Sequence, residues 1–90
     1  MRNIVLDFTG CSHWSKIHKI IKESFDFPDY YGENLSALWD CLDGYCSHRL
    51  QVYIKGIDTL TEEYFEYMKR VLVIFSRVHS ENPGFTFEII

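Results

Sequence analysis

The chain has 90 residues, of which 47% are hydrophobic and 24% are charged, with a formal net charge of −4 and a pI near 5.4. This length allows one domain, 1–90, and the apolar content excludes a disordered chain. The nine basic residues are scattered, which argues against direct binding of nucleic acid. The sequence shows neither a signal peptide nor an apolar run near the ~20 residues of a membrane helix. We therefore expect a soluble cytoplasmic protein.

The first segment predicts a strand and then a helix. Apolar residues alternate with others over 3–8, as in a strand that buries one face. Gly10 breaks this strand, and Ser12 is a candidate N-cap. Apolar residues at helical spacing then predict a helix over about 13–25.

A turn and a second, shorter helix follow. Pro28 ends the first helical segment, and 30–32 is expected to be a loop. Asn34 can cap a helix over about 35–43, and Gly44 is expected to stop it.

The second half of the chain predicts a strand over 50–55, followed by a connector over 56–61 with a short helical turn. A long helix over 62–81, capped by Thr61, comes next, and a strand over 85–90 ends the chain. Strands separated by helices favour parallel pairing through crossover connections. We predict a two-layer α/β domain, in which helices cover one face of a three-stranded parallel sheet.

Negative charge is concentrated in one quarter of the chain. The stretch 23–48 contains no lysine or arginine, although it contains six acids. An acidic region with aromatic residues is suited to a positively charged partner. The acids are Glu23, Asp26, Asp29, Glu33, Asp40 and Asp43.

On a helical wheel of 34–44, Asp40 falls well away from the apolar stripe. Its neighbours on the outer face are small, and none is basic, so the carboxylate has no salt-bridge partner on its own helix. Such a helix can enter a cleft and present one negative charge, although exposed acids often serve only solubility. The stripe consists of Leu35, Leu38, Trp39 and Leu42, and the small neighbours are Ser36, Ala37, Cys41 and Gly44.

Two adjacent tyrosines precede this helix. Tyr30 and Tyr31 could both pack against the helix, but exposed aromatics beside an acidic helix are typical of interface hot spots. We expect one ring to point inward and the other outward. Trp39 is expected in the core with an exposed rim.

The sequence carries few signs of catalysis or cofactor binding. The three cysteines include no C-x-x-C pair, which argues for free thiols rather than a disulfide framework or a zinc site. The four histidines are interpreted as surface or packing residues. Asp40 and Asp43 alone would form a weak magnesium site for a small hydrolase. We expect no enzyme activity, no cofactor and no metal.

Residues 28–35 are Pro-Asp-Tyr-Tyr-Gly-Glu-Asn-Leu, residues 37–42 are Ala-Leu-Trp-Asp-Cys-Leu, and Gly44 follows. This pattern closely resembles the barstar family. Members of this family are intracellular inhibitors of the secreted bacterial ribonuclease barnase. The resemblance is dense over 27–45 and continues as compatible element order elsewhere. It implies a barstar-like fold and an inhibitor that is a monomer when free and binds its ribonuclease one to one.

The resemblance also implies how the inhibitor works. The helix 34–44 and the preceding loop would occlude the ribonuclease active site. Asp40 would occupy the place of an RNA phosphate, and Tyr30 would lie over a catalytic histidine. The expected partner-binding residues are Asp40, Tyr30, Tyr31, Asn34, Ser36, Trp39, Asp43, Gly44, Tyr45 and Glu81.

The chain departs from the family pattern at two positions. Ser36 and Arg77 stand where the best-known member has acidic residues, whereas Glu81 matches an acidic position. These changes would weaken binding to the same ribonuclease or indicate a different partner. The alternative is therefore a binding module of the same fold whose partner is another toxin or a regulatory protein.

Overall fold

Three strands form one parallel sheet in the order β1-β2-β3. The structure is a computed structural model that describes residues 2–45 and 49–90, apart from the side chain of Tyr45. The strands are β1 (Arg2–Asp7), β2 (Leu50–Lys55) and β3 (Phe85–Ile89). Both pairings are parallel, which confirms the predicted sheet.

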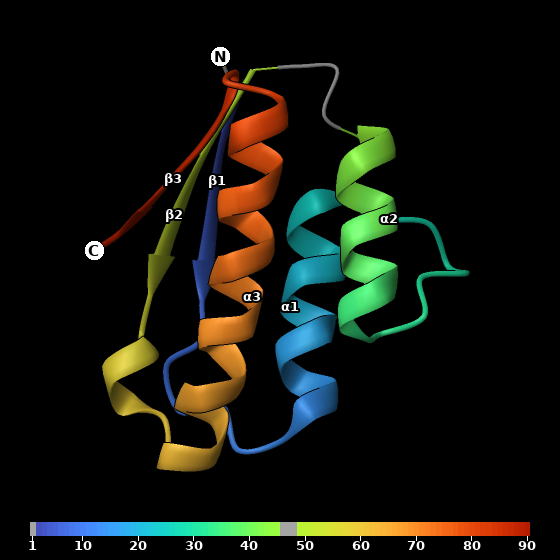
Figure 1. The fold of residues 1–90 in the computed structure, drawn as a ribbon. Coiled ribbons are helices and arrows are strands. Elements are labelled where there is room, and N and C mark those ends of the chain that lie inside the picture. Colours follow the sequence, from blue (N-terminus) through green and yellow to red (C-terminus); the bar gives the residue numbers. More distant parts are fainter. Residues whose placement is uncertain (1, 46–48) are drawn as a thin grey trace.

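The sheet buries one face and exposes the other. In β1, Ile4 and Leu6 are buried, whereas Val5 between them is 54% exposed. Successive side chains of a strand point to opposite faces, so this alternation assigns the two sides of the sheet. Figure 1 shows the α-helices together on the buried side.

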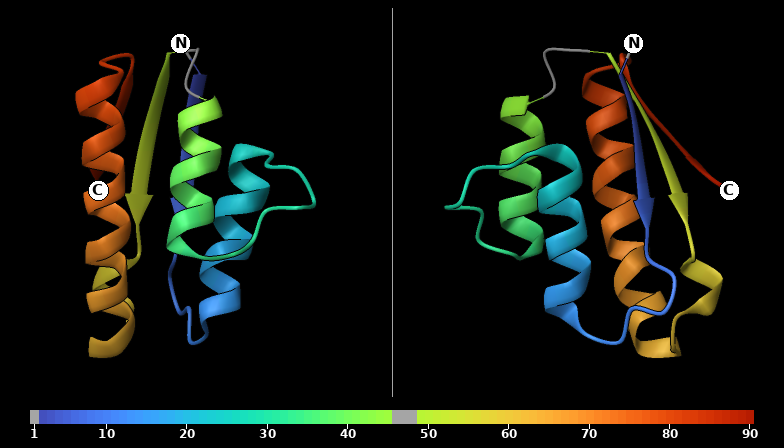
Figure 2. Two further views of the ribbon diagram at one scale, coloured as in Figure 1. Left: turned by 45° about the vertical axis from the view of Figure 1, so that its right-hand side comes forward. Right: turned by 180° about the vertical axis from the view of Figure 1, so that it is seen from behind.

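The helices are α1 (Trp14–Phe25), α2 (Leu35–Tyr45) and α3 (Glu62–Glu81), with a 3-10 turn, η1 (Ile57–Thr59), between β2 and α3. α1 packs against β1, α3 packs against β3, and α2 packs against α3. Figures 1 and 2 show α2 and the loop before it on the side away from the sheet. The outer surface of α2 is therefore free of the sheet.

A cluster of phenylalanines ties the layers together. The ring of Phe75 on α3 lies 6.3 Å from Phe25 on α1, 5.6 Å from Phe85 and 5.7 Å from Phe87, both on β3. Phe25, Phe75 and Phe85 are 0% exposed. Burial of these three rings fixes α1 and α3 on the sheet.

Two predicted helix boundaries were wrong. The N-cap of α1 is His13 instead of Ser12, because the Nδ1 atom of His13 accepts a hydrogen bond from the backbone N–H of Ser15. α2 also continues through Gly44 to Tyr45. Gly44 does not take the left-handed conformation that ends many helices, and glycine within a helix costs only about 1 kcal/mol relative to alanine.

Candidate functional site

A side-chain cap starts α2, as the sequence predicts. The Oδ1 atom of Asn34 accepts from the backbone N–H of Ala37 at 2.8 Å, and its Nδ2 atom donates to the carbonyl of Gly32 at 3.1 Å. The amide thus joins the end of the loop to the first turn of the helix. Asn34 is exposed, but its side chain is already engaged within the chain.

The two faces of α2 have opposite environments. Leu38 and Leu42 are fully buried, and Trp39 is partly buried at the edge of the stripe. Asp40 is exposed on the outer face, as the wheel predicts. Packing of the apolar stripe therefore determines where the carboxylate points.

The Asp40 carboxylate lies beside a hollow of about 420 Å³ between α2 and the preceding loop. Tyr30 and Gly44 also line this hollow, together with Cys41. Asp40 makes no ion pair within residues 2–45 and 49–90, so its charge is not neutralised by this part of the chain. Burial and the nearby Asp40 charge raise the pKa of the Cys41 thiol, which keeps that group neutral.

The two adjacent tyrosines point in opposite directions. The side chain of Tyr30 is 84% exposed, whereas that of Tyr31 is 5% exposed. The Tyr31 hydroxyl is 2.7 Å from Nδ1 of His18 in α1. The expected inward and outward pair is confirmed, and Tyr30 is the ring that faces solvent.

His18 connects the loop to two helices from inside the protein. Its Nδ1 contacts Tyr31, and its Nε2 makes a short hydrogen bond with the hydroxyl of Tyr67 on α3. A neutral imidazole can accept from one hydroxyl and donate to the other. Burial lowers the pKa of His18 from its usual 6.5, an effect that the charge of Glu33 partly opposes. Tyr31 therefore anchors the loop to a neutral buried group.

The start of the loop is fixed by the end of α1. Asp26 adopts a left-handed φ of 57°, and the backbone N–H of Phe27 donates to the carbonyl of Lys22 at 2.9 Å.

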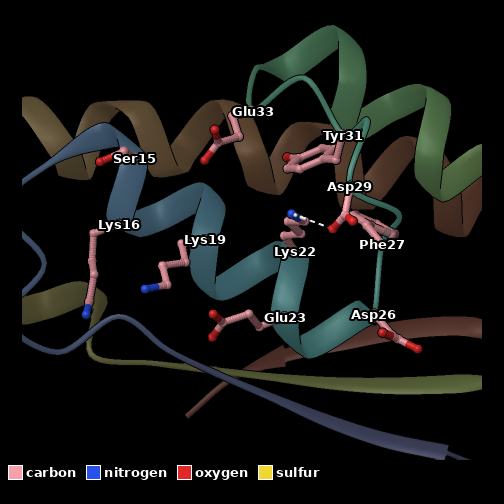
Figure 3. Close-up of a pocket in the computed structure, with 10 residues that line it drawn as sticks. All are labelled: Ser15, Lys16, Lys19, Lys22, Glu23, Asp26, Phe27, Asp29, Tyr31 and Glu33. Carbon is pink, nitrogen blue, oxygen red and sulfur yellow. Dashed lines mark ion pairs between the residues drawn. The ribbon is translucent and has the colours of Figure 1, made fainter.

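Lys22 also forms an ion pair with Asp29 at 3.3 Å (Figure 3). This pair lies at a hollow of about 700 Å³, which α1 lysines and loop acids line together. Lysines and acids both line this hollow, whereas Asp40 is the one charged residue among the described residues that line the α2 hollow.

A cation–π contact joins α2 to α3. The guanidinium of Arg77 lies 4.7 Å from the ring centroid of Trp39. Such contacts contribute roughly 0.5–1 kcal/mol at exposed sites. Trp39 thus has a buried edge in the core and a face covered by Arg77.

One turn farther along both helices, Asp43 and Glu81 line a common hollow of about 320 Å³. Neither carboxylate makes an ion pair within the described parts of the chain. Ser36 is exposed at the start of α2, on the preceding turn relative to Asp40. The surface along α2 and α3 therefore has separated acidic positions.

Most of the expected partner-binding residues lie on α2 or directly before it, but they divide into two groups. Tyr30, Asp40 and Gly44 share one hollow, whereas Asp43 and Glu81 share another. Tyr31 is a buried anchor, 5% exposed, and it lines the hollow beside α1 instead of either of these two. The side chain of Tyr45 lies outside the described residues, as does Cys46, so their expected roles stay predictions.

Sequence reasoning missed two contacts that shape this site. His18 was expected only to pack, and its hydrogen bonds join residues 13 and 49 positions away. Arg77 was noted for its charge but not for its contact with Trp39, 38 positions away. The polar position of His18 on an otherwise apolar helix face was the one available signal.

The described residues contain no group of three or more His, Cys, Asp or Glu side chains arranged to hold a metal ion. Within the same residues, no helix combines the length and the apolar character needed to cross a membrane.

Comparison with known proteins identifies the fold. The family described as Barstar (barnase inhibitor) matches residues 1–90. The Bacillus subtilis (strain 168) protein named "Putative ribonuclease inhibitor YrdF" is 35% identical over 81 residues, which cover 90% of this chain and 89% of that protein. The family is one of inhibitors rather than enzymes, in agreement with the prediction from the sequence. The chain belongs to the barstar family.

Proposed function

We propose that this protein inhibits a small secreted bacterial ribonuclease by placing the outer face of α2 and the Tyr30 loop over the enzyme's active site. The observation that carries this proposal is the exposed Asp40 carboxylate, which has no ion pair in the described chain and lies beside the exposed Tyr30 ring. Membership of a family described as barnase inhibitors supports it.

The electrostatics fit a ribonuclease as the partner. An enzyme that cleaves RNA must bind phosphate, so its active site carries positive charge. Asp40 would take the place of that phosphate and pair with the cationic side chains. Charge complementarity of this kind accelerates encounter and penalises partners of the wrong sign. Binding should therefore weaken as salt screens the attraction.

The remaining residues have distinct roles in the proposal. Tyr30 would cover a catalytic histidine with its exposed ring, while Tyr31 and Asn34 would hold the loop and the helix in place. Trp39, Gly44 and Tyr45 would border the contact. Additional contact residues are Ser36, Asp43 and Glu81. We propose that the free inhibitor is a cytoplasmic monomer and forms a one-to-one complex.

The test is titration of a small secreted ribonuclease, with barnase as the first probe, and measurement of residual RNA cleavage at two salt concentrations. We expect Asp40→Ala to weaken binding by about 2 kcal/mol or more, on the scale of interface hot spots. The barnase–barstar pair is one of the systems that established this scale, so the figure is not specific to this chain. Folding should be unaffected because the side chain is exposed.

A matched control removes the same charge elsewhere. Asp58 is also exposed, but it lies on η1 beside a different hollow, so Asp58→Ala should leave inhibition unchanged. Equal inhibition by wild type and Asp40→Ala would remove Asp40 from the mechanism. Capture of a different toxin or regulatory protein, with loss of capture in Asp40→Ala, would favour the alternative of a barstar-like binding module with another partner.

A further inference from the structure

The α2–α3 surface carries one cation in a fixed position. The Arg77 guanidinium is held over the Trp39 ring at 4.7 Å, and Arg77 is exposed. Stacking on a ring face leaves the N–H groups at the edge of the guanidinium able to donate to another molecule. The charge is therefore positioned without being neutralised.

Arg77 makes no ion pair with any described residue, although a possible partner lies close in the sequence. Glu81 is four residues later on the same helix, a spacing at which opposite charges often pair. The carboxylate of Glu81 instead lines the hollow that also contains Asp43. Opposite charges thus remain separate along one surface.

This cation falls within the area that a partner at Asp40 would cover. A standard protein interface buries about 800 Å² on each side, which corresponds to a disc of roughly 16 Å radius. Trp39 precedes Asp40 in the chain, and Arg77 stacks directly on Trp39. A partner centred on Asp40 therefore meets the guanidinium as well.

We propose that Arg77 determines specificity by requiring an acidic side chain on the partner, placed beside the basic site that receives Asp40. This inference rests on the proposed function and extends it to the charge pattern of the ribonuclease. The enzyme recognised by this inhibitor has a positive active site and a negative residue on the rim that faces α3.

The physical basis is the cost of like charges across an interface. A ribonuclease with a basic residue at this rim would place two cations together, and that arrangement would weaken the complex substantially. A carboxylate at the same position would form a charge-assisted and geometrically specific pair with the guanidinium. Arg77 therefore favours one ribonuclease and excludes others with uniformly basic rims.

The experiment compares wild type with Arg77→Glu, Arg77→Met and Arg77→Lys against barnase and a panel of other small secreted bacterial ribonucleases. For the enzyme that wild type inhibits most tightly, we expect Arg77→Glu to raise the inhibition constant about tenfold or more. Arg77→Met should give a smaller loss, and Arg77→Lys should retain most of the affinity. The loss in Arg77→Glu should shrink at high salt, which a purely structural role would not produce.

Arg70→Glu is the matched control, because it makes the same charge change on α3 about 10 Å nearer the start of the helix. It should alter the inhibition constant less than about twofold. Equal or tighter inhibition by Arg77→Glu, with inhibition still lost in Asp40→Ala, would overturn this inference and leave the proposed function intact. Wild-type protein that inhibits no member of the panel would overturn both.

Discussion

Two hollows of similar size lie at different places in the molecule, and the residues that line them differ in net charge. The hollow beside α2, which Tyr30 and Asp40 line, has a volume of about 420 Å³. The hollow between α3 and β3 has a volume of about 390 Å³ and a mostly apolar lining. Its cation, Lys69, is paired with Glu66 at 2.9 Å and lies 5.3 Å from the Phe65 ring centroid.

The difference lies in charge compensation rather than in shape. Lys69 has its carboxylate and its aromatic ring within its own helix. Asp40 has no such partner in the part of the chain that the structure describes. The α3–β3 hollow is lined by one acid, Asp58, and one cation, Lys69, whereas the α2 hollow is lined by the acid Asp40 and by no cation among the described residues. This difference in net charge distinguishes the α2 hollow.

The largest effect should come from the core beneath the α2 hollow. Leu38 is fully buried, and we expect Leu38→Ala to lower the free energy of unfolding by about 3 kcal/mol, because it leaves a cavity under the helix. Urea unfolding measures this change. Val73→Ala is the control, since Val73 on α3 is 59% exposed and should change stability little. Equal losses in the two variants would show that α2 is not held by its apolar stripe.

A smaller effect should separate the two hollows by function. Tyr30→Ala should weaken ribonuclease binding by about 1–2 kcal/mol, because it removes an exposed aromatic anchor, and it should leave stability unchanged. Phe65→Ala makes a comparable truncation in the α3–β3 hollow and should not affect binding. Calorimetric titration of both variants would measure this difference. A larger binding loss from Phe65→Ala would place the interface at the other hollow.

The smallest effect should appear as a pH dependence of the scaffold under the α2 hollow. The pKa of His18 in the folded protein is below its usual 6.5, so the unfolded chain takes up the proton first as the pH falls. The free energy of unfolding should be highest above pH 6.5, fall as the pH drops below that value, and level off below the pKa of His18 in the folded protein. Unfolding in urea at a series of pH values from 7.5 to 5.5 measures this slope.

His18→Gln should flatten that slope, because glutamine has no group that titrates in this pH range. The groups that face His18 are the hydroxyls of Tyr31 and Tyr67 and the charge of Glu33. Stability that stays constant from pH 7.5 to 5.5 in the wild type would contradict the lowered pKa.

Local patterns were sufficient to predict most of the fold. β2 and α3 begin and end at the predicted residues. Strict alternation of apolar side chains defines β2, and Thr61 with the acids after it marks the start of α3. The Gly44 stop failed because a glycine permits a helix end without requiring it. The choice depends on the path of the chain beyond the helix, which local composition does not determine.

The exposed position of Asp40 on α2 was also predictable, since it follows from the spacing of apolar residues on one short helix. Which of the two tyrosines, Tyr30 or Tyr31, faces solvent was not predictable, because it depends on His18 and Tyr67 in two other helices. The contact between Trp39 and Arg77 likewise requires the register of α2 against α3. Contacts between distant segments leave no periodic signal in the sequence.

The buried Tyr31 anchor has a consequence for the kinetics of association. Because the loop is fastened from inside and capped at both ends, its conformational entropy is already lost when the protein folds. A partner that binds there as proposed would meet a surface that needs no rearrangement, so collision and docking could occur in one step. We therefore expect encounter at this surface to be governed by diffusion and orientation rather than by a slow change of shape.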